Sequence, residues 1–263
     1  MIEHIVSGII QGIAEWLPIS SEGALFLIKV NFFHWQGEIG ELVQESLFLH
    51  LGTFLAALIY LRREVVVILK TLFNYRVSNN ENQRILKFLV ISTFVSGVLG
   101  FIVLKIISDI SDSYIPGKLI TAIIGLLLLI TAWLQIRAKG GDTKKADQLK
   151  TGDGLILGLS QGLAALPGLS RSGITIASLL LRGFDKSLAL RLSFLMSLPI
   201  VLAGNIILNV SGFSLSYDSF IALAFSFLFG LLTIDILLRL AKKINFGYFV
   251  LSFAVLTFLA AIV

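Results

Sequence analysis

The segment from Pro167 to Thr175 carries the side chains best suited to hold an anion. It reads Pro-Gly-Leu-Ser-Arg-Ser-Gly-Ile-Thr and precedes an apolar run. Proline and the two glycines, Gly168 and Gly173, favour a tight turn. Amide groups at the start of a helix bind anions, and the planar guanidinium of Arg171 matches phosphate oxygens. The segment therefore predicts a phosphate site, to which three hydroxyl groups add neutral donors: Ser170, Ser172 and Thr175.

A second polar cluster lies near the N-terminus, and its members are Gln11, Glu15, Ser20, Ser21 and Glu22. Gln11 and Glu15 are four residues apart, so their side chains share a face if this segment is helical. A carboxylate such as Glu15 can coordinate a divalent cation or act as a general base. A serine such as Ser21 can attack phosphorus when a base lies next to it. The cluster is therefore a candidate for chemistry directed at a phosphate.

Each of these residues also has a purely structural interpretation. A buried arginine at membrane depth needs an anionic partner, so Arg171 could merely pair with Glu15 or Glu22. Ser20 and Ser21 follow a proline and could simply cap the start of a helix. These interpretations stay open beside the catalytic ones, because a cap or a salt bridge can also belong to an active site.

The two clusters occupy equivalent places in two copies of one sequence pattern. Residues 8–23 and 158–173 share a glycine, a Gln-Gly pair and a final glycine at the same spacing, with proline and serine between them. The surrounding units, residues 2–30 and 152–184, each have two apolar arms that are too short to cross a bilayer at about 1.5 Å per helical residue. We expect two re-entrant helix-loop-helix units, since irregular backbone at membrane depth must be buried in protein or line a cavity. Paired interrupted segments of this kind are typical of a site built by an internal repeat.

The composition is that of a membrane protein. The chain is 56% hydrophobic and 14% charged, which excludes an ordinary soluble domain and a disordered chain. It has no cysteine, which excludes disulfides and thiol chemistry, and its three histidines show no metal-ligand spacing. We expect a single all-α polytopic membrane domain over residues 1–263, with halves at about 1–136 and 152–263 joined by a linker at 137–151. Six transmembrane helices are predicted, at about 44–61, 87–107, 118–136, 187–209, 219–239 and 247–262.

Basic side chains gather in the loops on one side of this arrangement. They follow the first, third and fifth predicted spans and the second re-entrant unit, whereas residues 1–43 hold only Lys29. The positive-inside rule then places these loops and the linker in the cytoplasm and both termini outside. Because three spans follow each re-entrant unit, the halves are inverted, and the two broken loops should meet near the middle of the membrane. The net charge of +5 thus reflects topology, and we expect no nucleic-acid partner.

These residues together resemble the motifs of the undecaprenyl-diphosphate phosphatase (bacitracin-resistance) family. Glu15 followed by Leu17–Ser21 is similar to the first motif of the family, and Pro167–Thr175 is similar to the second. The resemblance extends to His50–Thr53 and Ser193–Leu195, so it covers essentially the whole chain. It implies a plasma-membrane enzyme that removes the terminal phosphate of a polyprenyl diphosphate and so recycles the lipid carrier of peptidoglycan and other cell-wall glycans. A divalent cation, Mg²⁺ or Ca²⁺, is also implied, and a second copy of the chain could be a partner.

The resemblance also assigns roles to individual residues. Glu15 matches the second acidic residue of the first motif and would hold the cation, while Gln11 stands at the first position of that motif. Ser21 matches the serine proposed as nucleophile. The phosphate-binding set of the family corresponds to Ser170, Arg171 and Thr175.

The chain departs from the family pattern at one position. Members read Ser-Ser-x-Gly-His after the proline, but here Ala24 stands where the histidine is expected. Glu22 adds a carboxylate nearby. His50, at a position where relatives often carry glutamine, could supply an imidazole instead, although a histidine within a spanning helix also commonly makes a polar contact between helices.

We therefore expect a membrane phosphatase in which Glu15, helped by Glu22, acts as the base. Ser21 would attack phosphorus or orient a water molecule, and Arg171 would stabilise the developing charge. A non-hydrolytic polyprenyl-phosphate flippase is the alternative, because inverted repeats with broken helices are a transporter pattern. Further contacts with the substrate are expected from Gln11, Ser20, Ser170, Ser172, Thr175, Gly168, Gly173 and His50.

Overall fold

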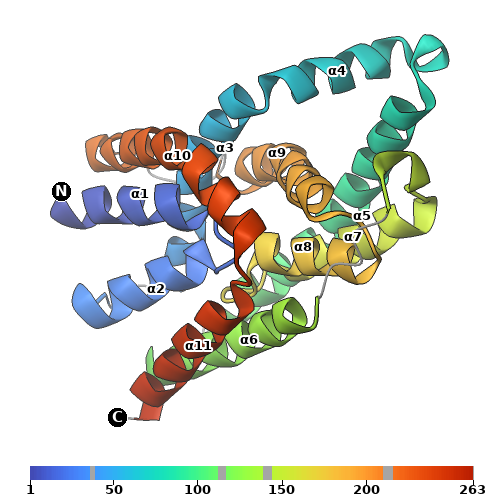
Figure 1. Cartoon of the computed structure of the whole chain (residues 1–263). Coiled ribbons are helices and arrows are strands. Elements are labelled where there is room, and N and C mark those ends of the chain that lie inside the picture. Colours follow the sequence, from blue (N-terminus) through green and yellow to red (C-terminus); the bar gives the residue numbers. More distant parts are fainter. Residues whose placement is uncertain (36–38, 112–116, 139–143, 210–215, 263) are drawn as a thin grey trace.

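The structure is a computed structural model that describes residues 1–35, 39–111, 117–138, 144–209 and 216–262 (Figure 1). The described residues form α-helices and short 3-10 turns, with no β-strand longer than an isolated bridge between Lys144 and Phe184. The helices are α1 (Ile2–Ala14), α2 (Ser21–Phe32), α3 (Ile39–Tyr60), α4 (Arg62–Phe73), α5 (Asn80–Ser111), α6 (Gly117–Arg137), α7 (Thr151–Leu163), α8 (Arg171–Leu181), α9 (Lys186–Asn209), α10 (Tyr217–Lys243) and α11 (Gly247–Ile262).

Five helices, α3, α5, α6, α9 and α10, are long and apolar enough to cross a membrane. Their outer faces are apolar as well, since a stripe of exposed side chains on α5 consists of Val90, Phe94, Val98 and Phe101. An apolar surface of this extent needs lipid rather than water around it. The chain is thus a multi-pass membrane protein. The sixth predicted span corresponds to α11, whose 16 residues extend about 24 Å, less than the roughly 30 Å of a bilayer core.

Both predicted re-entrant units are broken helices. The four arms α1, α2, α7 and α8 contain 13, 12, 13 and 11 residues, which is about 16–20 Å of helix and too short to span. In Figure 1, α1 and α2 extend to one side of the molecule and α7 and α8 to the other, so that the loops between the arms face each other at the centre.

The same cap begins the second arm of each unit. Ser20 Oγ accepts a hydrogen bond of 2.9 Å from the Gly23 amide, and Ser170 Oγ accepts one of 3.1 Å from the Gly173 amide. Each cap satisfies an amide group that the first turn of a helix leaves without a partner. Gly168 lies in the left-handed region with φ +102°, where a residue with a side chain would be strained. The predicted capping role of Ser20 is therefore confirmed, and Ser170 caps the second unit in the same way.

The two halves interlock rather than lie side by side. Each first arm packs on a spanning helix of the other half, α1 on α10 and α7 on α5, while α6 packs on α11 and α3 on α10. The repeated glycines permit this approach, because a Cβ at Gly8 would lie 2.3 Å from the Ala222 carbonyl oxygen and a Cβ at Gly158 would lie 2.6 Å from Val95 Cβ. Small residues of this kind let membrane helices come close together.

The amphipathic helix α4 lies where only a basic loop is expected from the sequence, and Thr71 is the side chain that it buries. This segment is too short to span a membrane, but its polar residues recur with the period of a helix, as expected of an amphipathic helix.

Of the predicted linker at 137–151, residues 139–143 lie outside the described residues. Its described end pairs with the loop after α8 through the Lys144–Phe184 bridge.

Candidate active site

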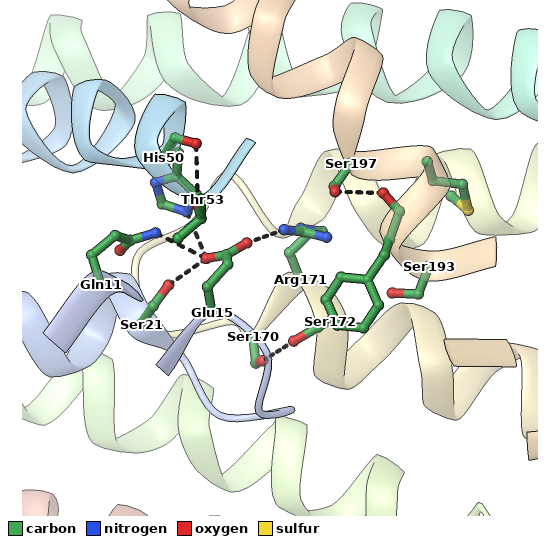
Figure 2. Close-up of polar contacts among 12 residues, drawn as sticks. Gln11, Glu15, Ser21, His50, Thr53, Ser170, Arg171, Ser172, Ser193 and Ser197 are labelled. Atoms are coloured by element: carbon green, nitrogen blue, oxygen red, sulfur yellow. Dashed lines mark hydrogen bonds and ion pairs between the residues drawn. The ribbon is translucent and has the colours of Figure 1, made fainter. Parts of the chain in front are cut away.

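Glu15 is the hub of the polar contacts at the centre of the molecule (Figure 2). It follows the last turn of α1, and its carboxylate is 7% exposed. Its Oε2 atom accepts hydrogen bonds of 2.9 Å from Gln11 Nε2 and 3.0 Å from Ser21 Oγ, and lies 3.2 Å from His50 Nε2. Its Oε1 atom forms an ion pair with Arg171 Nη2. The i, i+4 contact predicted between Gln11 and Glu15 is confirmed.

Arg171 brings the positive charge of the second half to this carboxylate. It is the first residue of α8, directly after the Ser170 cap. Its Nη1 atom is buried and has no hydrogen-bond partner among the described residues. Leaving such a buried donor without a partner costs about 1–3 kcal/mol of stability, and more for a charged group. The guanidinium is therefore suited to bind a further anionic ligand. The salt bridge to Glu15 and a ligand-binding role are therefore compatible.

A small cavity of about 50 Å³ opens beside this ion pair. That volume is several times the roughly 10–15 Å³ needed by one water molecule. Both loops contribute to its walls, and α3 supplies a histidine. The lining residues are Glu15, Ile19, Ser20, Ser21, Glu22, His50, Ala164, Leu169, Ser170, Arg171 and Ser172. The structure thus brings the predicted catalytic and hydroxyl-bearing residues together, apart from Thr175.

The two loops are tied to each other and to α6. Ser172 Oγ donates a hydrogen bond of 3.1 Å to the Leu17 carbonyl, which links the second loop to the first. On α6, Thr131 Oγ1 accepts from the Ser170 amide at 3.3 Å, and Gln135 Nε2 donates to the Pro18 carbonyl. Gln135 and Thr131 are absent from the sequence-based candidates. Their signal is a pair of polar residues four positions apart in an apolar helix, which places both on one face.

Ser21 and the two capping serines differ in what their hydroxyl groups bind. The hydroxyl oxygens of Ser20 and Ser170 accept from backbone amides, whereas Ser21 Oγ donates to Glu15. A serine whose proton is directed at a carboxylate is arranged for activation as a nucleophile. The geometry therefore distinguishes Ser21 from Ser20, which the sequence alone does not.

His50 reaches the same carboxylate from α3. Its Nδ1 atom lies 2.7 Å from the Ser46 carbonyl oxygen, which accepts and so assigns the Nδ1 proton, and Nε2 is directed at Glu15. The imidazole is thereby fixed in orientation between α3 and the first loop. Ala24 has no polar side chain, so within the described residues the imidazole of this pocket comes from His50.

Three predicted substrate contacts lie behind the cavity. Thr175 is fully buried and its Oγ1 donates to the Arg171 carbonyl at 2.7 Å, with Ser193 Oγ also 2.7 Å away. Gly173 approaches α6 so closely that a Cβ there would lie 2.5 Å from Gln135 Nε2. Gly168, as noted, shapes the loop. In this arrangement the three residues support the loop that holds Arg171.

The carboxylates differ in their readiness to hold a divalent cation. Both oxygens of Glu15 already accept from N–H or O–H donors. A metal cation bound to Glu15 would also be repelled by the positive charge of Arg171, so direct coordination by Glu15 does not fit this arrangement. In the described part of the chain, no group of three His, Cys, Asp or Glu side chains lies close enough to hold a metal ion. Glu22 lines the cavity and receives no hydrogen bond or ion pair from the described residues. One such carboxylate suits a Mg²⁺ ion bound mainly by phosphate oxygens.

The chain is similar to known proteins along almost its full length. A family model described as bacitracin resistance protein BacA matches residues 4–259. An undecaprenyl-diphosphatase of Methanococcoides burtonii is 44% identical over 98% of this chain and 97% of its own length. Undecaprenyl-diphosphatases of Methanothrix thermoacetophila and Thermosipho africanus are 33% and 35% identical, each over 97% of this chain and over 95% and 98% of their own lengths. The chain therefore belongs to the BacA family of bacitracin resistance proteins.

Proposed function

We propose that this protein is an integral membrane phosphatase that hydrolyses a polyprenyl diphosphate to the monophosphate and phosphate. The observation that carries the proposal is the double contact of Glu15, which accepts the Ser21 proton on one oxygen and pairs with Arg171 on the other. The nucleophile Ser21, its base Glu15 and the phosphate-binding guanidinium of Arg171 therefore lie beside one cavity. All three relatives are undecaprenyl-diphosphatases by name, which supports the same reaction.

The reaction needs a nucleophile, a base and charge stabilisation at the terminal phosphorus. Ser21 Oγ attacks phosphorus while its proton passes to Glu15, and the bond between phosphorus and the bridging oxygen breaks, which releases the polyprenyl monophosphate. Glu15 returns this proton to the departing phosphate oxygen, then takes a proton from the water that attacks the phosphoserine and passes it to Ser21 Oγ as phosphate leaves. If Ser21 only orients a water molecule, the same base serves a single attack and gives the same products. Either route depends mainly on positioning and electrostatics, as is usual for phosphoryl transfer.

The second loop supplies the stabilising charge. The Ser172 hydroxyl proton is donated to the Leu17 carbonyl, which leaves Arg171 Nη1 and the first-turn amides of α8 as the donors beside the cavity. These groups suit the equatorial oxygens of the transferred phosphoryl group, where negative charge is spread in the transition state. Ser170 keeps α8 capped and so keeps these donors in place.

Dependence on a divalent cation, Mg²⁺ or Ca²⁺, is part of the proposal. The cation would supply charge neutralisation to the diphosphate, and Glu22 is the free carboxylate of the cavity that would hold it. Glu22 would otherwise assist Glu15 as a base. Phosphate release after chelation with EDTA and after addition of each cation tests this point.

The membrane arrangement rests on the five long apolar helices and on the distribution of basic residues. We propose six spans, α3, α5, α6, α9, α10 and α11, and two re-entrant units, α1–α2 and α7–α8, in inverted halves within the plasma membrane. The basic residues on α4 and at the start of α5 support a cytoplasmic position for these two segments. Both chain termini would then lie on the extracytoplasmic side. The polyprenyl chain would lie between helices, with the diphosphate in the central cavity.

The experiment is phosphate release from farnesyl diphosphate by the purified protein in detergent. Arg171→Ala should lower the rate by at least about 100-fold, as expected for loss of one transition-state donor. Arg63→Ala, on the exposed surface of α4, is the matched control and should leave the rate unchanged. Release by Arg171→Ala at the wild-type rate would overturn the assignment. Tight binding of the substrate without release by the wild type would support the flippase alternative.

A further inference from the structure

A larger cavity lies away from the candidate active site, where the start of α5 meets the start of α7. Its volume is about 500 Å³, within the roughly 300–1,000 Å³ of ligand sites in proteins. Figure 1 shows α7 lying along α5 on the side of the molecule opposite the N-terminus. Two buried apolar side chains, Phe88 and Leu149, form part of its wall.

The charged side chains that line this cavity all carry positive charge. They are Arg84 and Lys87 on α5 and Lys150 before α7, and no carboxylate is among the lining residues. None of the three takes part in an ion pair with another described residue. Arg84 Nη1 donates to the Leu149 carbonyl at 3.1 Å, so this side chain is held at the wall. Like charges gathered around one space repel each other, and an anion in that space relieves the repulsion.

The start of α7 adds partial positive charge to the same space. Thr151, the first residue of α7, lines the cavity, and the first amides of a helix lack intrahelical acceptors. The nearby carboxylate of Asp153 is already committed, since it is buried, accepts from the Lys150 amide at 2.7 Å and pairs with Arg182. Asp153 therefore does not neutralise the three cations, and Asp147, which is equally close to Lys150 along the chain, forms no ion pair with the described residues.

The junction of α1 and α10, which is built in the same way, is neutralised by the protein itself. There the N-terminal ammonium of Met1 lies 3.2 Å from Asp218 Oδ2, and His4 Nε2 lies 3.6 Å from the same atom. Charges at that junction are thus paired within the chain. At the junction of α5 and α7 the three exposed cations have no such partner among the described residues, which leaves them available to an anion from outside the chain.

We propose that this cavity is a binding site for a phosphate group, carried by the headgroup of an anionic phospholipid or present as free phosphate. The exposed apolar stripe of α5 begins at Val90, just beyond the cavity, so the cavity lies at the end of the lipid-facing surface. Basic pockets between membrane helices at that depth bind phospholipid headgroups. The apolar wall formed by Phe88 and Leu149 suits the glycerol and upper acyl carbons of a lipid.

The test uses the full-length protein in a neutral detergent and native mass spectrometry with phosphatidylglycerol or phosphatidylcholine. The wild type should retain phosphatidylglycerol and not phosphatidylcholine. The variant Lys87→Gln/Lys150→Gln, which leaves the Arg84–Leu149 hydrogen bond intact, should bind it about 25-fold more weakly, at about fivefold for each lost cation. If free phosphate is the natural ligand, phosphate should raise the melting temperature of the wild type more than that of this variant, without retention of the lipid.

A matched control removes two positive charges from the same region outside the cavity. Arg63→Gln/Lys70→Gln on α4 should retain phosphatidylglycerol and respond to phosphate like the wild type. Phosphate release from farnesyl diphosphate should be unchanged in both double variants, which shows that they fold and keeps this result separate from the proposed catalytic function. Equal retention and equal response to phosphate by both double variants would overturn the proposal.

Discussion

Glu15 and Arg171 are 156 residues apart in the chain, yet their side chains form an ion pair inside the protein, with exposures of 7% and 16%. Each comes from a different half, and each lies next to a loop that breaks a helix (Figure 2). Neither half alone contains both the base, Glu15, and the phosphate-binding guanidinium of Arg171. The ion pair therefore makes assembly of the two halves a condition for the proposed catalysis.

Replacing Glu15 by glutamine should abolish hydrolysis and destabilise the protein. The base is lost, and Arg171 is left as a buried charge without a partner, which costs about 3–5 kcal/mol for a broken buried pair. Phosphate release and thermal unfolding in detergent measure the two effects. Asp235→Asn is the matched control, because its ion pair with Arg239 is 47% and 75% exposed and should contribute at most about 1 kcal/mol. Wild-type activity in Glu15→Gln would contradict the role of Glu15 as base.

Alanine substitutions at Ser20 and Ser21 should separate capping from catalysis. Ser20→Ala removes a helix cap, so it should lower stability by about 1 kcal/mol and keep the rate of hydrolysis within about tenfold of wild type. Ser21→Ala removes the hydroxyl that donates to Glu15, so it should lower the rate by about 1,000-fold with little change in melting temperature. Ser170→Ala repeats the cap removal in the second half. The reverse order of the two rate effects would show that Ser21 is not the nucleophile.

The imidazole of His50 should be needed for full activity. His50→Gln keeps a donor near Glu15 but removes the imidazole, and we expect phosphate release to fall by about 100-fold. Adding Ala24→His, which restores the residue expected from the family pattern, should recover part of the loss. If His50→Gln hydrolyses farnesyl diphosphate at the wild-type rate, the histidine serves only as a contact between helices.

The repeated glycines should be required for packing of the two halves. Gly8→Ala places a Cβ 2.3 Å from the Ala222 carbonyl oxygen, so α1 and α10 must move apart, which costs about 1–3 kcal/mol. Gly158→Ala should have a similar effect on α7 and α5. Gly152→Ala is the control, since nothing lies within 4 Å of the added Cβ and alanine favours the helix. Thermal unfolding compares the three variants, and equal melting temperatures would refute the requirement for close contact.

Local features of the fold could be predicted from the sequence because their causes are local. The apolar runs predict the long helices to within a few residues, except that α3 and α5 begin earlier and α5 and α10 end later than expected. The serines that follow Pro18 indicate the first cap, and the short arms on either side of Pro18 and Pro167 predict the two broken helices. These features depend on hydrogen bonds to the amide groups of a single helical turn and on the period of the apolar residues, both of which are local.

The composition of the cavity was decided only by tertiary structure. Glu15, Arg171 and the loop serines could be expected to meet because they lie in the two copies of the repeat. That Gln135 and Thr131 brace the loops, and that Thr175 turns to Ser193 behind the cavity, depends on which faces of α6 and α9 meet the broken units. Helix periodicity indicates that a face is polar, but the partner of that face is set by close packing between segments far apart in the chain.

The sequence by itself thus determined a membrane protein with two broken helices, one rich in carboxylates and the other holding an arginine. The tertiary structure decided that one carboxylate, Glu15, accepts from Ser21 and Gln11, pairs with Arg171 and lies 3.2 Å from His50 Nε2. It also decided that Glu22 and three cations beside α7 remain without ion-pair partners in the described chain. The physical reason is that a pattern within one segment sets which groups are available, whereas the pairing of charges requires atoms within about 4 Å, a distance set only when all helices are packed.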